Sequence, residues 1–189
     1  MKLLTERIRL AKAEEAELLH GLLQRAYAPL IPQGIHFTIT RSSVEDVRAV
    51  IASESTFVLE NEGRLVATLT VRFPWAADSK QVSPWPFLHW FAVDPEFKGQ
   101  GFGSRIIRYV EESFLRDTLK SPAVYLATAI KHPWLSQLYL RRGYQPFHRA
   151  VNPLGVELVY LTRVLDQQRY QQAKIKEYVH DFIENSLTA

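Results

Sequence analysis

Three glycines lie within five positions of the segment VDPEFKGQGFGSRI, residues 93–106, between an apolar run and a helical pattern. Glycine loses more backbone freedom on folding than any other residue, so this density indicates a loop with a purpose. Bare N–H groups at the first turn of a helix can approach a bulky anion, because no Cβ atom intervenes. The loop therefore predicts a phosphate or pyrophosphate site, and a tight turn that binds nothing is the alternative. Three cationic side chains could assist it: Lys98, Arg105 and Arg108.

The spacing of the glycines decides between the known classes of phosphate loop. A P-loop requires a Lys directly after its last glycine, and Ser104 follows Gly103 here, so that class is excluded. A dinucleotide fingerprint has the spacing GxGxxG at the start of a βαβ unit, whereas this loop reads GxGxG in the middle of the chain. A nucleotide-binding oxidoreductase is therefore disfavoured.

Two segments together carry a family resemblance. AVDPEFKGQGFGSRII resembles the acetyl-CoA-binding signature of the GNAT superfamily of N-acetyltransferases, with Lys98 where Arg or Gln is usual. Downstream, QLYLRRGYQPF resembles the Leu-Tyr, three residues, Gly-Phe motif of the same family, with Tyr144 in place of the Phe. Two motifs in the right order are far more specific than either motif alone.

The resemblance implies acetyl-CoA as co-substrate and no metal. The pyrophosphate would sit on the glycine loop, and the pantetheine arm would run along the preceding strand. Its amides would pair with free backbone groups of Phe91 and Val93, as an added strand does. For this the next parallel strand has to diverge. The implied cofactor-binding residues are Phe91, Ala92, Val93, Lys98, Gly99, Gln100, Gly101, Phe102, Gly103 and Ser104.

The resemblance also implies roles in catalysis. Tyr139, the Tyr of the Leu-Tyr motif, would be the general acid for the leaving thiolate. His89 is the candidate base, because HWFAV is similar to the His-bearing strand of arylalkylamine N-acetyltransferases. Strict alternation would place His89, Phe91 and Val93 on one face of their strand, and the Phe91 N–H could stabilise the oxyanion.

Other readings of these side chains stay open. Tyr139 could be an aromatic residue packed on the sheet, and His89 could be a core histidine. Water or Glu60 could then deprotonate the amine. His132, just before Pro133 and Trp134, is expected to cap a helix or lie at the surface.

No sequence motif identifies the amine that accepts the acetyl group. A slot between the first helices and the Pro/Trp-rich loop could be lined by Tyr27, His36, Phe37, Trp75 and Trp85, which could equally be core and lid residues. The function expected is direct transfer of an acetyl group from acetyl-CoA to a primary amine of a small molecule. A protein or peptide N-acetyltransferase and a non-catalytic acyl-CoA sensor are the alternatives.

The elements that must position these residues alternate along the chain. Strands are expected at 7–11, 55–60, 64–73, 87–93, 123–129, 145–149 and 156–164, and helices at 14–27, 42–51, 101–117 and 132–143. This order predicts one α/β domain over 1–189, with a core of about 5–163 and a C-terminal helical extension of about 164–189. We expect a mixed, mostly antiparallel sheet with helices on both faces, and a parallel, right-handed unit from Phe87 to Ala127.

Composition bounds the partners and the location. The 189 residues include no Cys, and the formal net charge is +3 with the basic residues dispersed. A cytoplasmic protein with no nucleic-acid partner is therefore expected. The N-terminus has scattered charges, unlike a signal peptide, and no apolar run is long enough to cross a bilayer. The C-terminal helix should pack on its own domain, and a homodimer contact is the less favoured use of it.

Overall fold

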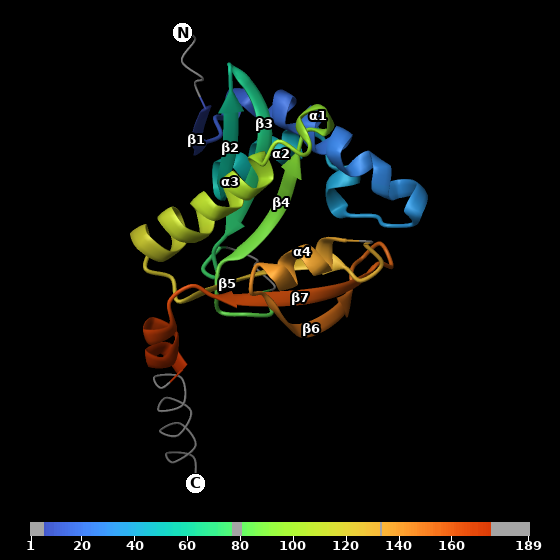
Figure 1. The fold of residues 1–189 in the computed structure, drawn as a ribbon. Helices are drawn as coiled ribbons and strands as arrows, with labels where there is room; N and C mark the ends of the chain where they lie inside the picture. Colours follow the sequence, from blue (N-terminus) through green and yellow to red (C-terminus); the bar gives the residue numbers. More distant parts are fainter. Residues whose placement is uncertain (1–5, 77–80, 133, 175–189) are drawn as a thin grey trace.

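A seven-stranded sheet forms the centre of the computed structural model, which describes residues 6–76, 81–132 and 134–174 (Figure 1). The strands are β1 (Glu6–Leu10), β2 (Ser55–Asn61), β3 (Arg64–Arg72), β4 (Phe87–Val93), β5 (Ala123–Ala129), β6 (Gln145–Val151) and β7 (Glu157–Val164). Their order across the sheet is β1-β2-β3-β4-β5-β7-β6. Only β4 and β5 pair in parallel, so the mixed and mostly antiparallel sheet expected from the sequence is confirmed.

Helices cover both faces of this sheet (Figure 1). Among the described residues, the helices before β7 include α1 (Ala16–Tyr27), α2 (Val44–Ser53), α3 (Phe102–Arg108) and α4 (Leu135–Arg141). α3 continues into η5 (Tyr109–Thr118), a π-helical segment. Four 3₁₀ segments complete the set: η1 (Ala13–Glu15), η2 (Ala28–Gln33), η3 (Thr38–Arg41) and η4 (Pro95–Phe97).

Two apolar clusters hold the helices on their faces. On one face, Ile106 and Ile107 of α3 pack with Leu69 and Leu88 of the sheet, together with Tyr139 of α4. On the other face, buried side chains of α1 and α2 pack around Val58 of β2 and Ala92 of β4. Helical spacing of the apolar residues produces these buried stripes, since positions three or four apart share a helix face.

The strand β4 is irregular at its centre. Thr70 of β3 pairs with His89, and Thr68 pairs with Ala92, so Trp90 and Phe91 together lie opposite Leu69. This is a β-bulge, and Trp90 there adopts a left-handed φ of 51°, which is uncommon for a bulky residue. On its other side β4 pairs with β5 only at Phe87–Tyr125 and Leu88–Leu126. The two strands therefore diverge after Leu88, as the cofactor mode predicted above requires.

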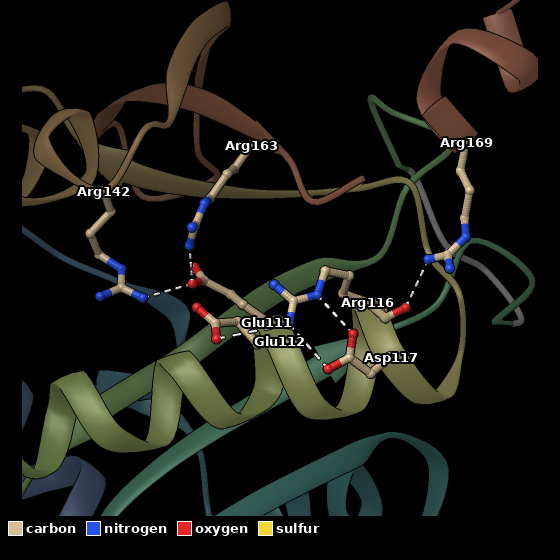
Figure 2. Close-up of polar contacts among 7 residues, drawn as sticks. All are labelled: Glu111, Glu112, Arg116, Asp117, Arg142, Arg163 and Arg169. Atoms are coloured by element: carbon tan, nitrogen blue, oxygen red, sulfur yellow. Dashed lines mark hydrogen bonds and ion pairs between the residues drawn. The ribbon is translucent and has the colours of Figure 1, made fainter. Parts of the chain in front are cut away.

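A buried carboxylate ties three elements together beside α4 (Figure 2). Glu111 of η5 is fully buried and accepts hydrogen bonds from Arg142 Nη2 at 2.6 Å and Tyr144 Oη at 2.6 Å. The guanidinium of Arg163 on β7 pairs with the same carboxylate. These bonds fix the end of α4 against η5 and β7.

After β7 the chain forms a helix over residues 167–174. The ring of Tyr170 lies 5.8 Å from that of Trp85, and Arg169 Nη1 donates to the Arg116 carbonyl at 3.0 Å (Figure 2). This part packs on its own domain. The rest of the expected extension, 175–189, lies outside the described residues.

Candidate active site

A cavity of about 720 Å³ lies where β4 and β5 diverge. Its walls come from the end of α1 and η2, from β4, from the glycine loop with the start of α3, and from β5 with α4. Both expected catalytic residues, Tyr139 and His89, line it. So do nine of the ten expected cofactor-binding residues; Gln100 is not among the lining residues. Sequence motifs separated along the chain therefore meet around one space.

The glycine loop has the backbone that only glycine adopts readily. Gly99 and Gly101 have left-handed φ values of 78° and 81°, and Gly101 is the N-cap of α3. At Gly103 the reason is space, because a Cβ atom would lie 3.0 Å from Val93 Cγ2 and 3.4 Å from Phe91 Cζ. The N-terminus of α3 is thus held close to β4, and the first N–H groups of a helix have no partner within the helix.

Of the three cations suggested near this loop, the structure brings one to the cavity. Lys98 lines it, and Arg105 and Arg108 do not. Arg105 is engaged elsewhere: its Nε donates to Glu6 at 2.8 Å and its Nη1 donates to the Gln100 carbonyl at 3.1 Å.

Asp94 anchors the loop at its start. The carboxylate is almost completely buried, and it accepts bonds from Arg25 Nη2 at 2.5 Å and from the Glu96 N–H at 3.1 Å. Burial raises the pKa of Asp94, but the hydrogen bonds from Arg25 and Glu96 outweigh it, and the net pKa is lowered. The carboxylate therefore stays ionised and ties α1 to the loop.

Two phenols approach the divergent part of β4. Tyr139 of α4 is 4% exposed and packs in the cluster under α3 and α4. Burial raises its pKa far above the ordinary phenol value, and the neighbouring Tyr27 and Glu111 raise it further. Tyr27 of α1, from the other face, donates its hydroxyl to the Phe91 carbonyl at 3.2 Å. Both groups keep their protons at neutral pH and can act as donors.

His89 does not share a face with Phe91 and Val93, and the alternation assumed from the sequence was wrong here. The bulge at Trp90–Phe91 adds one residue, so His89 lies on the side of Thr70, Thr68 and Ala92, while Phe91 and Val93 join the cluster under α3. Its Nε2 lies 2.5 Å from Glu54 Oε2. Glu54 ends α2 and was not among the residues singled out from the sequence.

His132 caps α4, as one of its expected roles required, and it is buried rather than at the surface. Its Nδ1 accepts the N–H of Leu135 at 3.2 Å, and the residue is 8% exposed. Because Nδ1 is the acceptor, Nε2 carries the proton, and the ring also lines the cavity. Burial lowers the pKa of His132, and Lys98 lowers it further.

Some of the residues expected to line the acceptor slot do line the cavity, and others do not. Tyr27 and Phe37 line the cavity and pack edge to face at 5.7 Å, whereas His36, Trp75 and Trp85 do not line it. The Pro/Trp-rich loop precedes β4 and lies at the opposite end of that strand from the glycine loop, so its described residues are not a wall. Instead η2 and Trp90 close this side. Glu60 binds Arg9 at 2.8 Å on β2, away from the cavity.

Comparison with known proteins gives a family match and two curated relatives. The acetyltransferase (GNAT) family matches residues 22–144. An S-alkylcysteine N-acetyltransferase from Bacillus subtilis (strain 168) is 46% identical over 140 residues, which cover 74% of this chain and 78% of the relative. An S-(2-succino)cysteine N-acetyltransferase from the same organism is 44% identical over 140 residues, covering 73% of this chain and 83% of the relative.

Solved structures share the fold at low sequence identity. The ribosomal-protein-S18-alanine N-acetyltransferase from Escherichia coli has a TM-score of 0.65 at 14% identity and covers 86% of this chain and 96% of its own. The PaiA N-acetyltransferase from Thermoplasma acidophilum, solved in complex with coenzyme A, has a TM-score of 0.64 at 12% identity, covering 85% and 99%.

Proposed function

The chain belongs to the GNAT acetyltransferase family, and on that premise we propose that it acetylates the primary α-amine of a cysteine thioether with acetyl-CoA as donor. Its similarity to the two curated relatives supports an N-acetyltransferase that acts on small molecules. The single observation that supports the finer statement is the cavity, which joins the glycine loop, the divergent edge of β4 and the side chains of Tyr139 and His89. A cytoplasmic location, where acetyl-CoA is at hand, belongs to the same proposal.

The residues present fit acetyl-CoA. Left-handed Gly99 and Gly101 leave the start of α3 open to a pyrophosphate, and Lys98 adds a positive charge. Beyond Leu88 the edge of β4 toward β5 has no strand pairing, so it can accept the amides of an extended arm. Acetyl-CoA supplies the activated acetyl group when bound.

Three groups of the chain then divide the chemistry of a direct attack. His89 takes the proton of the amine, because burial lowers its pKa and keeps the ring neutral near pH 7. The Phe91 N–H, at the bulge, stabilises negative charge on the carbonyl oxygen. Tyr139, whose pKa burial raises, holds its proton until the thiolate departs and then donates it.

The walls of the acceptor side favour an apolar thioether. Tyr27, Leu30, Phe37 and Trp90 give aromatic and aliphatic surface, and sulfur packs well against aromatic ring edges. Among the described lining residues Lys98 carries a positive charge, and the two histidines are neutral near pH 7 because burial lowers the pKa of His89 and of His132. We expect S-alkyl substituents to be preferred to substituents that add carboxylates, which would need further cations.

Two measurements test the proposal in sequence. Acetyl-CoA and CoA should raise the melting temperature, while NADP and ATP should not, because a ligand that binds only the folded state stabilises it. Thiol release should then follow addition of S-methylcysteine or S-benzylcysteine. A shift with NADP alone would overturn the transferase assignment.

The choice of acceptor distinguishes the remaining possibilities. Equal or better turnover of peptide N-termini would favour a peptide N-acetyltransferase. Binding of acetyl-CoA with no acceptor at all would favour the sensor. For the thioether preference, kcat/KM for S-alkylcysteines should exceed that for S-(2-succino)cysteine, and the reverse order would contradict the reading of the walls.

A further inference from the structure

We propose that Glu54 is a positioning residue for His89: its carboxylate holds the imidazole with Nδ1 as the free base, and Arg72 holds the carboxylate. The proposal rests on the function proposed above, since it gives His89 the task of taking the proton of the amine. It concerns the C-cap residue of α2, which belongs to neither the glycine loop nor the Leu-Tyr motif.

The geometry is that of a buried three-membered chain. Glu54 Oε2 lies 2.5 Å from His89 Nε2, and Glu54 Oε1 accepts from Arg72 Nε at 2.8 Å. The side chains of Glu54 and His89 are 9% and 12% exposed. Phe87 stacks on the imidazole with ring centroids 5.6 Å apart and the planes 9° from parallel. The ring is thus held at one edge by a carboxylate and on one face by an aromatic side chain.

The protonation state of Glu54 determines which nitrogen of His89 is free. Burial raises the pKa of Glu54, but its bonds with His89 and Arg72 outweigh this and lower the pKa overall. An ionised carboxylate only accepts hydrogen bonds, so Nε2 must carry the proton and Nδ1 the lone pair. Among the described residues no group bonds to Nδ1, and His89 lines the cavity. The lone pair is therefore available to an amine or to a water between them.

The groups around His89 shift the pKa of its imidazole in opposite directions. Burial lowers the pKa of His89, the hydrogen bond and charge of Glu54 raise it, and the charge of Arg72 lowers it. From β5, Tyr125 lies behind Phe87, with ring centroids 4.9 Å apart. Glu54 thus stabilises the imidazolium that forms when the amine loses its proton, as an orienting carboxylate does for a catalytic histidine.

A purely structural role for Glu54 would not require a hydrogen bond to His89 Nε2. A buried ion pair contributes little net stability compared with apolar packing of the same volume, and Arg72 with Glu54 alone would already satisfy both charges. The placement of His89 on the remaining carboxylate oxygen, inside the wall of the cavity, is what the positioning role explains.

The experiment compares pH profiles of kcat for the wild type, Glu54→Gln and Arg72→Gln with acetyl-CoA and an S-alkylcysteine. The neutral ring is the active form, so the rate rises as pH increases through the His89 pKa. Glu54→Gln removes an influence that raises this pKa, so the rising limb should move to lower pH, with kcat reduced at least about 10-fold out of the ~10²–10⁴-fold that general bases supply. Arg72→Gln should move the limb to higher pH. Glu54→Asp keeps the charge and should recover part of the wild-type profile.

A titration of the imidazole protons by NMR gives a readout without turnover. His89 is identified among the six histidines by its absence in His89→Gln, and its pKa should fall in Glu54→Gln and rise in Arg72→Gln. Glu45→Gln, on the exposed face of the same helix, removes the same charge and should leave the His89 pKa and kcat unchanged. If Glu54→Gln does not fold, Arg72→Gln carries the test.

The outcomes separate the two proposals. A wild-type protein that acetylates no amine overturns the proposed function, whatever the titrations show. An active wild type whose pH limb and His89 pKa are unmoved in both variants overturns the positioning role alone. Limbs that move in opposite directions support it.

Discussion

Tyr139 and Tyr27 bring two phenols to the same stretch of β4 from opposite faces of the sheet. Of the two hydroxyls, only that of Tyr27 makes a hydrogen bond within the described part of the chain, to the Phe91 carbonyl. Tyr139 lies beside the Glu111 network, which fixes the end of its helix through Arg142 and Tyr144. Its ring also packs edge to face on Tyr144 at 5.5 Å. A hydroxyl that is held in place but not yet bonded suits a proton donor.

Replacing Tyr139 by Phe removes this donor and keeps the ring. We expect kcat to fall by about 10²-fold, the lower end of what a positioned acid supplies, with little change in the KM for acetyl-CoA. Tyr109→Phe is the matched control, because Tyr109 is 37% exposed and does not line the cavity. Thiol release under conditions where chemistry limits the rate measures the effect. Equal kcat for the two variants would return Tyr139 to a packing role.

Sequence motifs indicated some of these residues and not others, for a physical reason. Glycines at fixed spacing and the Leu-Tyr pair are local patterns, so they can be read along the chain. The contact between Glu54 and His89 joins residues 35 positions apart, and nothing in either neighbourhood marks the other. Tyr27 was suggested for the acceptor slot, but its bond to the Phe91 carbonyl depends on how α1 crosses β4.

Among the elements, the glycine loop and α3 form one unit whose backbone can be tested by a single methyl group. Gly101→Ala places a Cβ on a left-handed residue, which costs about 1–2 kcal/mol. The nearest atom would be Arg105 Nη1 at 3.0 Å, the end of a side chain that can move. Gly63→Ala is the control, because Gly63 has the same left-handed conformation, with φ of 79°, in the turn between β2 and β3.

Both variants should lose similar stability in urea unfolding, but only Gly101→Ala should raise the KM for acetyl-CoA, by about 10-fold, equivalent to ~1.4 kcal/mol. The cause would be a methyl group between the N–H groups of α3 and the pyrophosphate. A KM that changes equally in both variants would show that the loop acts only through stability.

The Glu111 network links η5, α4 and β7, and its removal should affect the whole arrangement (Figure 2). Glu111→Gln leaves Arg142 and Arg163 without their shared counter-charge, so we expect a loss of about 3 kcal/mol in the free energy of unfolding. Glu112→Gln is the neighbouring control: Glu112 is 38% exposed and 4.0 Å from Arg116, so its loss should cost under about 1 kcal/mol. Urea denaturation measures both. Equal stability of the two variants would show that the buried carboxylate is dispensable.

Element order was predictable because alternation and helical spacing are strong signals. The break in alternation at Trp90–Phe91 was not, since a bulge inserts one residue without changing the composition of the strand. That single insertion moved His89 to the opposite face from Phe91. The position of the Pro/Trp-rich loop was predictable, because this loop precedes β4 and the glycine loop follows it. The two loops must therefore lie at opposite ends of the strand.

At the scale of the whole molecule, β1 to β4 form one part of the sheet and β5, β7 and β6 the other. The backbone pairing between the parts is confined to Phe87–Tyr125 and Leu88–Leu126. Figure 1 shows β4 leaning away from β5 along most of its length. An extended ligand seated in this gap would bridge the two parts.

Hydrogen exchange should detect this bridging. With CoA bound, amides of 90–93 in β4 should exchange more slowly, because their backbone gains partners and loses access to solvent. Amides of β2, which is paired on both sides, serve as the internal reference and should change less. Mass spectrometry of peptides from both strands gives the comparison. Protection that is uniform over the sheet would indicate general stabilisation instead of binding in the gap.

The left-handed backbone of Trp90 has a consequence for how this enzyme can change. A bulky residue with positive φ costs about 1–3 kcal/mol that the fold must offset elsewhere, so glycine at this position would relieve the strain. Glycine would also delete an aromatic wall of the acceptor side and loosen the bulge that sets His89 apart from Phe91. A laboratory selection for heat resistance alone would thus favour a substitution that a selection for turnover would reject. At residue 90, thermal stability favours glycine, whereas activity favours the tryptophan side chain.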